Sequence, residues 1–172
     1  SFESRELPCS IVAEDEFVPT LFACKTVDTD PQKADRVRRG LKNVSADVWN
    51  AVRLGYLTCV EDRGTLINDF VHMAMHYGAG VMRMLADDTV SRLTKAVRAL
   101  KQESHKYNGF VRFSISEDNT ITSIIEPKNS VLPLLAPHFC ARYPNESFLI
   151  YDKTHSQALV WHNRQKMIIP LD

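Results

Sequence analysis

A long amphipathic pattern between Asp88 and Tyr107 constrains the fold of this chain more than any other stretch. Because each residue turns about 100° around a helix axis, one narrow stripe of this segment is apolar and the opposite side is polar and basic. The sequence therefore predicts a helix that packs on a core along one side and is exposed along the other. The stripe consists of Val90, Leu93, Val97, Leu100, Ser104 and Tyr107.

The exposed side of this predicted helix is basic. Such a face is commonly only solvated, but its cations are also the side chains that bind nucleic-acid phosphates, and both interpretations stay open here. Glu103 lies at the edge of the apolar stripe, about 200° from His105 around the helix, so these two side chains cannot form an acid–base pair across it. The candidate phosphate ligands are Lys95, Arg98, Lys101, His105 and Lys106.

A β-hairpin is predicted to follow the helix. Gly109 has the position of a C-terminal glycine, Phe110–Ser116 alternates as a strand, and Thr120–Glu126 supplies the second strand. A three-residue loop pairs Ile115 with Ile121 and keeps the apolar residues on one face, so we predict this register rather than that of a two-residue loop.

The hairpin carries two candidate ligand-binding residues. Arg112 lies on its less apolar face, where it either forms a structural salt bridge with Glu126 or binds an anion, and the pattern favours neither alternative. Phe110, at the junction of helix and strand, is a candidate for stacking on a nucleic-acid base.

The rest of the chain alternates between one helix and further strands. A short helix is predicted from Val131, with a cap at Asn129 or Ser130, and it places His138 and Arg142 four residues apart on one face. Three more strands are predicted at Ser147–Asp152, Gln157–His162 and Gln165–Pro170.

The order of these elements predicts an α+β fold. In this fold a helical N-terminal half packs against an antiparallel sheet of about five strands. Upstream, Asp30 and Ser45 are predicted to cap two earlier helices. A length of 172 residues suits a single domain with an irregular lead-in at 1–29, a helical part at 30–108 and a sheet part at 109–172.

Composition excludes several classes of protein. Lys plus Arg and Asp plus Glu both number 21, so the chain as a whole has no charge that would attract nucleic acid. The four cysteines lack CxxC spacing, which predicts reduced, mostly buried thiols and a cytoplasmic protein. No apolar run is long enough to span a membrane.

His72 and His76 have the spacing of a metal pair but no third ligand, and we predict no metal and no cofactor.

The candidate catalytic residues are chosen because polar residues from several elements could meet in one pocket, and not because they form a complete sequence motif. No nucleotide-binding glycine loop or serine-hydrolase motif occurs. Five polar residues nevertheless fall at the ends or on the polar sides of predicted elements, where one pocket could gather them. Three of them, Glu103, His138 and Asp152, are candidate catalytic groups, and the other two are Arg112 and Arg142.

A family resemblance covers almost the whole chain. Its central motif is ESHKYNGFVRF, its second motif is EPKNSVLPLLAPHFCARYPNESFLIYD, and DPQKADRVRRGLKNVS and IVAEDEFVPTLF match as well. These segments resemble a bacterial family of uncharacterised domains described as DNA metabolism proteins. The matching positions are Glu103, His105, Gly109, Phe110, Arg112 and Phe113 in the first motif, and Pro127, Leu135, His138, Phe139, Arg142, Pro144 and Asp152 in the second.

The resemblance implies a biological context and no reaction. Members of that family accompany a radical-SAM protein that acts in DNA modification or repair, and similar domains are fused to uracil-DNA-glycosylase-like domains. This chain lacks a CxxxCxxC signature, so it resembles the companion rather than the radical enzyme. Family members usually begin with a Tyr-Asp-Gly strand and a helix, which are absent here, so we expect either that the sequence is incomplete or that this piece of the fold is missing.

Two functions follow as hypotheses. In the first, the protein is a DNA-binding or adaptor module for the radical-SAM partner, with the helix cations on phosphates. In the second, it is an enzyme acting on a nucleic-acid or nucleotide substrate. Arg112 and Arg142 would then bind phosphate, and His138 would serve as general acid or base, oriented by Glu103 or Asp152. A structural role for all these polar residues is the third alternative.

Overall fold

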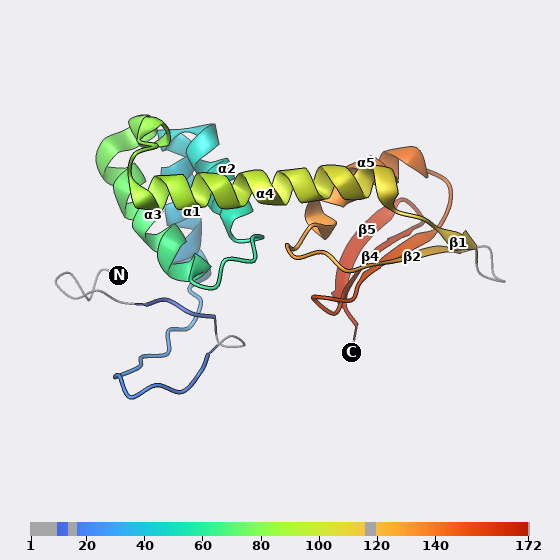
Figure 1. The fold of residues 1–172 in the computed structure, drawn as a ribbon, viewed down its shortest axis with the longest axis horizontal. Coiled ribbons are helices and arrows are strands. Elements are labelled where there is room, and N and C mark those ends of the chain that lie inside the picture. The colour runs from blue at the N-terminus through green and yellow to red at the C-terminus, as the bar shows by residue number, and fades with distance from the viewer. Residues whose placement is uncertain (1–9, 14–16, 116–119, 172) are drawn as a thin grey trace. The chain divides into compact units, whose positions relative to one another are not determined.

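Helices fill the first part of the chain and strands the last, and this α+β architecture confirms the predicted fold class (Figure 1). The computed structural model describes residues 10–13, 17–115 and 120–171. The predicted three-residue hairpin loop and Cys9 lie outside these residues. The chain divides into a helical unit, residues up to Tyr56 and Val60–Val97, and a sheet unit, Leu57–Cys59 and the residues from Arg98 onward. The prediction of a single domain, with the helical half packed on the sheet, stays a prediction.

The sequence correctly identifies the N-terminal caps of the first two helices of the helical unit. The Asp30 Oδ1 atom accepts hydrogen bonds from the backbone N–H groups of Gln32 and Lys33, each at 3.0 Å. Ser45 Oγ accepts from the N–H of Asp47 at 3.1 Å. Both caps satisfy donors that the first helical turn leaves unpaired. The helices are α1 (Pro31–Val44), α2 (Ala46–Gly55), α3 (Arg63–Tyr77), the 3₁₀ helix η2 (Gly78–Arg83) and the first part of α4 (Asp88–Phe110).

The core of the helical unit confirms the apolar stripe of α4. Val90 and Leu93 are fully buried together with Leu41, Val48, Leu66, Phe70 and Val81. At Gly55, the α2 backbone comes so close to α4 that a Cβ atom would lie 2.6 Å from Leu93 Cδ1. Glycine at that position therefore lets the two helices approach closely.

The sheet unit contains five strands in the order β1-β2-β3-β4-β5. Strands β3, β4 and β5 follow the predicted ranges closely. Helix α5 lies against β4 and β5. The elements are β1 (Ser114–Ile115), β2 (Ile121–Ile125), α5 (Leu132–Arg142), β3 (Phe148–Asp152), β4 (Gln157–His162) and β5 (Gln165–Pro170).

The sheet is mixed, which corrects the prediction of an antiparallel one. Strand β2 pairs with β3 in parallel, with Ile121 opposite Phe148 and Ile125 opposite Asp152, while the other neighbouring pairs are antiparallel. The physical reason is the connection: a helical crossover such as α5 returns the chain to the same end of the sheet, so the next strand runs in the same direction.

The junction between α4 and β1 also differs from the prediction. Helix α4 does not end at Gly109 but continues through Phe110, so Phe110 is the last helical residue rather than the first of a strand. Strand β1 is correspondingly short. The predicted register is confirmed, because Ile115 pairs with Ile121.

Aromatic rings form much of the core of the sheet unit. Phe148 is 1% exposed, and its ring lies 6.2 Å from that of Phe113, 6.4 Å from Phe139 and 6.3 Å from Tyr143. Trp161 of β4 stacks on it at 6.4 Å. Phe113 contacts Phe139 and Tyr143 as well, so the segment after α4 is held against α5.

The described cysteines confirm one part of the thiol prediction and correct another. Cys24, Cys59 and Cys140 are all free thiols. They are not mostly buried, because Cys24 and Cys59 are exposed and only Cys140 is half-buried. Burial raises the pKa of the Cys140 thiol above its ordinary value.

Hydropathy of the helices agrees with the sequence on one further point. Among the described residues, no helix has the length and apolar character that crossing a membrane requires.

Candidate functional site

Several polar residues of the sheet unit lie where the parallel strands β2 and β3 end. Ile125 and Asp152 are opposite each other at the carboxyl ends of these strands, and the N–H of Lys153 donates to the carbonyl of Ile125 at 3.0 Å. The loop that follows β2 and the turn that follows β3 therefore begin side by side. Loops at the carboxyl ends of parallel strands are a common place for binding sites.

Glu103 of α4 holds the loop after β2 in place. Its Oε1 accepts a hydrogen bond from the backbone N–H of Lys128 at 2.8 Å, and its Oε2 accepts from the N–H and Nδ2 of Asn129 at 2.9 and 2.6 Å. The side chain is half-buried. Three hydrogen bonds to one carboxylate give Glu103 a structural function.

Asn129 completes this connection and uses both ends of its amide. Its Nδ2 donates to Glu103, while its Oδ1 accepts from the backbone N–H of Cys59 at 2.9 Å. The neighbouring Ser130 N–H donates to the carbonyl of Leu57 at 2.9 Å. The predicted capping role of Asn129 or Ser130 is therefore wrong: Val131 is the N-cap residue of α5, and no side chain caps that helix.

The charge state of Glu103 follows from these contacts. Burial by itself raises the pKa of the Glu103 carboxyl, but hydrogen bonds from Lys128 and Asn129 and the positive charge of Lys128 outweigh burial. The net result is a pKa below the ordinary glutamate value, so Glu103 is ionised at neutral pH.

Asp152, at the end of β3, is paired with a histidine that the sequence analysis did not select. Asp152 is 1% exposed, and its Oδ2 lies 2.7 Å from Nδ1 of His155, whose side chain is 24% exposed. The N–H of His155 also donates to Asp152 Oδ1 at 3.1 Å. A carboxylate that accepts from Nδ1–H fixes the tautomer in which Nε2 can take up a proton.

Tyr107 lies close to this group of carboxylates. Burial raises the pKa of the Tyr107 hydroxyl, the negative charge of Glu103 raises it further, and the smaller charge effects of Asp152 and Glu126 act in the same direction. A hydrogen bond with the Glu126 backbone opposes them without reversing the shift. Tyr107 is therefore a neutral phenol at neutral pH.

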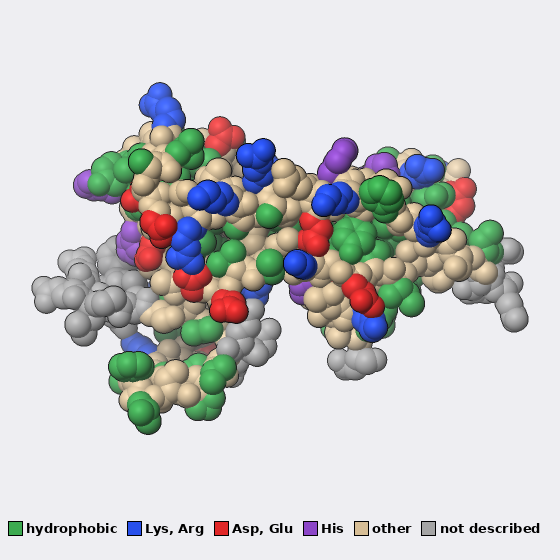
Figure 2. Space-filling view, in the orientation of Figure 1, with side chains coloured by type: hydrophobic (Ala, Val, Ile, Leu, Met, Phe, Trp, Pro, Cys, Tyr) green, Lys and Arg blue, Asp and Glu red, His purple; other side chains and the backbone are tan. Residues whose placement is uncertain are grey.

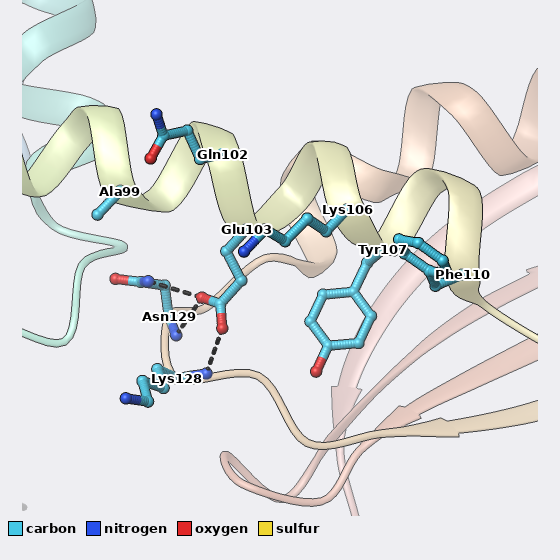
Figure 3. A pocket seen from close by; sticks show the side chains of 8 residues that line it. All are labelled: Ala99, Gln102, Glu103, Lys106, Tyr107, Phe110, Lys128 and Asn129. Atoms are coloured by element: carbon cyan, nitrogen blue, oxygen red, sulfur yellow. Dashed lines mark hydrogen bonds between the residues drawn. The ribbon is translucent and has the colours of Figure 1, made fainter.

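An open pocket of about 510 Å³ lies between one face of α4 and the loop after β2 (Figure 3). Figure 3 shows the carboxylate of Glu103 pointing toward Lys128 and Asn129, and both Tyr107 and Phe110 among the residues that line the pocket. We call this the α4 pocket. Its lining residues are Ala99, Gln102, Glu103, Lys106, Tyr107, Phe110, Lys128 and Asn129.

The cations predicted to bind phosphate are exposed on α4. In Figure 2, blue Lys and Arg side chains lie over this helix. None of the predicted cation side chains forms a hydrogen bond or ion pair with a described residue. Lys95 belongs to the helical unit; the other four belong to the sheet unit, and we call them the basic face. They are Arg98, Lys101, His105 and Lys106.

The structure does not join the remaining predicted residues into one pocket through direct contacts. His138 and Arg142 are exposed on α5, where Arg142 lies 5.7 Å from the centre of the Tyr143 ring. Arg112 is exposed in the segment that Phe113 anchors to α5 and forms no ion pair with a described residue.

Two polar contacts that the sequence analysis expects do not form, because the carboxylates concerned pair with other residues. Glu126 pairs with Lys153 Nζ at 2.9 Å rather than with Arg112. The carboxylates expected to orient His138 have other partners, because Glu103 binds Lys128 and Asn129, and Asp152 binds His155.

A metal site has no support in the geometry of the described chain. Within residues 10–13, 17–115 and 120–171, no three His, Cys, Asp or Glu side chains gather closely enough to hold an ion. His72 and His76 are both exposed on α3, and His76 packs edge-to-face on Tyr77 at 4.5 Å.

Some residues of this region carry a signal that sequence reasoning could have used. A glutamate at the border of an apolar stripe is partly buried and needs donors, and Glu103 was the only acidic side chain after Asp88 in the predicted helix. His155 follows Asp152 by three residues across a predicted turn, a spacing that favours a side-chain hydrogen bond. Nothing local indicates that Lys128 and Asn129 meet α4.

Comparison with known proteins adds a family but no activity. A family model, DUF4130, described as a domain of unknown function, matches residues 61–168 of the chain. The chain has no significant match among curated proteins or among solved structures.

Proposed function

The chain belongs to the DUF4130 family, and on that premise we propose that it is a nucleic-acid-binding module of DNA metabolism or repair. The family resemblance to companions of radical-SAM proteins supplies the proposed partner, and fused relatives supply a uracil-DNA-glycosylase-like domain as a second one. A cytoplasmic location, where thiols stay reduced, is part of the same proposal.

The observation that carries this proposal is the basic face of α4 beside an exposed aromatic ring. Its four cationic or titratable side chains are unpaired among the described residues, and Phe110, at the end of the same helix, is 79% exposed. Cations contribute affinity through phosphates, and an aromatic ring contributes through bases. The chain has no net charge, so attraction to nucleic acid has to come from such a local surface.

Removing cations from the basic face is expected to weaken binding and flatten its salt dependence. For Arg98→Ala/Lys101→Ala/Lys106→Ala, we expect the slope of log K against log salt to fall in magnitude by about 2, because each phosphate contact on a single strand contributes about 0.7. The measurement is fluorescence anisotropy of a labelled oligonucleotide at several salt concentrations.

A matched variant controls for net charge. Lys153→Ala/Arg164→Ala/Lys166→Ala removes the same positive charge from exposed residues of the sheet unit outside α4, and we expect it to keep the wild-type slope. If both triple variants change the slope equally, or if wild-type binding has no salt slope, the basic face is not the binding surface.

A second candidate function is an enzyme that acts on a nucleic-acid or nucleotide phosphate substrate. The Asp152–His155 pair favours it, since a buried carboxylate that orients a partly exposed imidazole is a common general-base arrangement. We expect such an enzyme to lose about 10²–10⁴-fold in turnover of labelled oligonucleotides on His155→Gln while binding is kept. Binding without conversion of any oligonucleotide, or conversion that His155→Gln leaves unchanged, would contradict this candidate.

A further inference from the structure

We infer that the α4 pocket holds one unstacked base of a single-stranded nucleic acid, with the adjoining phosphate on the lysines at its rim. This inference rests on the proposed function and adds the form of the ligand. It joins Phe110 to further pocket residues of the sheet unit that the proposed function does not use, chiefly Tyr107 and Lys128.

The aromatic wall of the pocket suits a base. Phe110 is 79% exposed, and half-buried Tyr107 lines the same pocket (Figure 3). Nucleobases stack on such rings with little dependence on sequence, because every base has a π face. An exposed phenylalanine at the end of a helix and at the edge of a pocket is thus a stacking platform with one side open to solvent.

The charges around the pocket fix the orientation of a bound nucleotide. Lys106 and Lys128 are exposed cations that line the pocket. Glu103 lines the same pocket but is half-buried and ionised, so it repels a phosphate that enters deeper than the exposed lysines. Tyr107 is neutral at neutral pH and adds no second negative charge. The base therefore enters the pocket, and the phosphate stays at the lysines.

The pocket is connected to the basic face through a shared residue. Lys106 lines the pocket and also belongs to the basic face, so a strand whose base occupies the pocket continues onto further phosphate ligands. The exposed amide of Gln102 lies on the same helical face, where it can donate to and accept from the edge of a base.

A single strand can place a base in the pocket at a lower free-energy cost than a duplex can. A duplex keeps its bases stacked and paired, so placing one base on Phe110 requires it to unpair and leave the helix, which costs free energy. A single strand has no such cost. The volume of about 510 Å³ lies within the range typical of sites for small organic groups.

The test compares Phe110→Ala with the wild-type protein on single strands and on a duplex of the same sequence. We expect the wild type to bind a labelled 12-nucleotide single strand at least about tenfold more tightly than the duplex. We expect Phe110→Ala to weaken single-strand binding by about 5- to 150-fold, with duplex binding and the salt slope unchanged. DNA and RNA single strands are measured in separate arms, and Phe110-dependent binding in either arm supports the site and identifies the sugar it accepts.

Two variants separate stacking from other effects of the substitution. Phe110→Trp keeps an aromatic ring and should restore single-strand affinity, whereas Ile124→Ala removes apolar surface from a residue of β2 that is 69% exposed and should change nothing. Salt-dependent binding that Phe110→Ala does not alter, or equal affinity for strand and duplex, overturns the inference and leaves the proposed function standing. Absence of binding to every oligonucleotide overturns both.

Discussion

Replacing Glu103 by Ala is expected to lower the free energy of unfolding of the sheet unit by about 2–4 kcal/mol. The carboxylate accepts three hydrogen bonds, and Asn129, which supplies two of the donors, is only 5% exposed. A hydrogen bond to a charged group contributes about 1.5–3 kcal/mol, and a buried donor left unpaired costs about 1–3 kcal/mol. Urea denaturation gives the free energy, and hydrogen exchange of the Asn129 amide locates the loss.

A second acidic residue of the same unit provides the control. Glu126 forms its ion pair with Lys153 where both side chains are 63% exposed, so Glu126→Ala should leave the denaturation curve unchanged. If the Asn129 amide exchanges as slowly in Glu103→Ala as in the wild type, the hydrogen bonds between α4 and the loop after β2 do not contribute to stability.

The contribution of Glu103 also has a defined pH dependence. Its folded-state pKa lies below the ordinary value of about 4.3, so the folded state is stabilised fully above that pH, and the stabilisation is lost as the pH falls through the lower folded-state pKa. The difference in stability between the wild type and Glu103→Gln should therefore be constant from pH 6 to 8 and shrink below about pH 4.3. A difference that grows on acidification would contradict this assignment.

Phe148→Ala is expected to destabilise the sheet unit by about 3–5 kcal/mol, because it removes a buried ring from the centre of the aromatic cluster. Phe148 is 1% exposed and lies within 6.4 Å of four other rings. Trp161 stacks on it, so tryptophan fluorescence in a Trp49→Phe background reports the sheet unit alone.

Phe110→Ala is the matched control for this prediction, since it makes the same truncation at an exposed position. We expect it to change the free energy of unfolding by less than about 0.5 kcal/mol. Because Phe113 depends on the cluster for its place against α5, Phe148→Ala should also increase hydrogen exchange around Arg112. Equal stability of the two truncated proteins would rule out Phe148 as a core residue.

Local chemistry explains which parts of the fold could be predicted from the sequence. The Asp30 and Ser45 caps, the apolar stripe of α4 and the strands β3 to β5 depend on residues close together in the chain, and each is present as predicted. The exposure of the α4 cations follows from the same helical period. Burial patterns with periods of 3.6 and 2 are thus sufficient to locate elements.

The predictions that fail depend on contacts between distant residues. The alternation of β2 and β3 is the same whether the strands pair in parallel or not; only the intervening helix α5 indicates the parallel arrangement. Glycine permits a helix end at Gly109 but does not enforce one. The partners of Glu103 lie 25 and 26 residues away, beyond the reach of any local pattern.

The hydrogen bonds of Asn129 and Ser130 have a consequence for dissecting the protein. Both residues bind the short segment Leu57–Cys59, which the family match over residues 61–168 leaves out. A fragment cut at the family boundaries would leave the Asn129 Oδ1 without the Cys59 N–H and the Ser130 N–H without the Leu57 carbonyl. Asn129 is also the residue that binds the Glu103 carboxylate. The family boundary in sequence and the boundary of the sheet unit are therefore different, and a fragment that keeps these hydrogen bonds has to include Leu57.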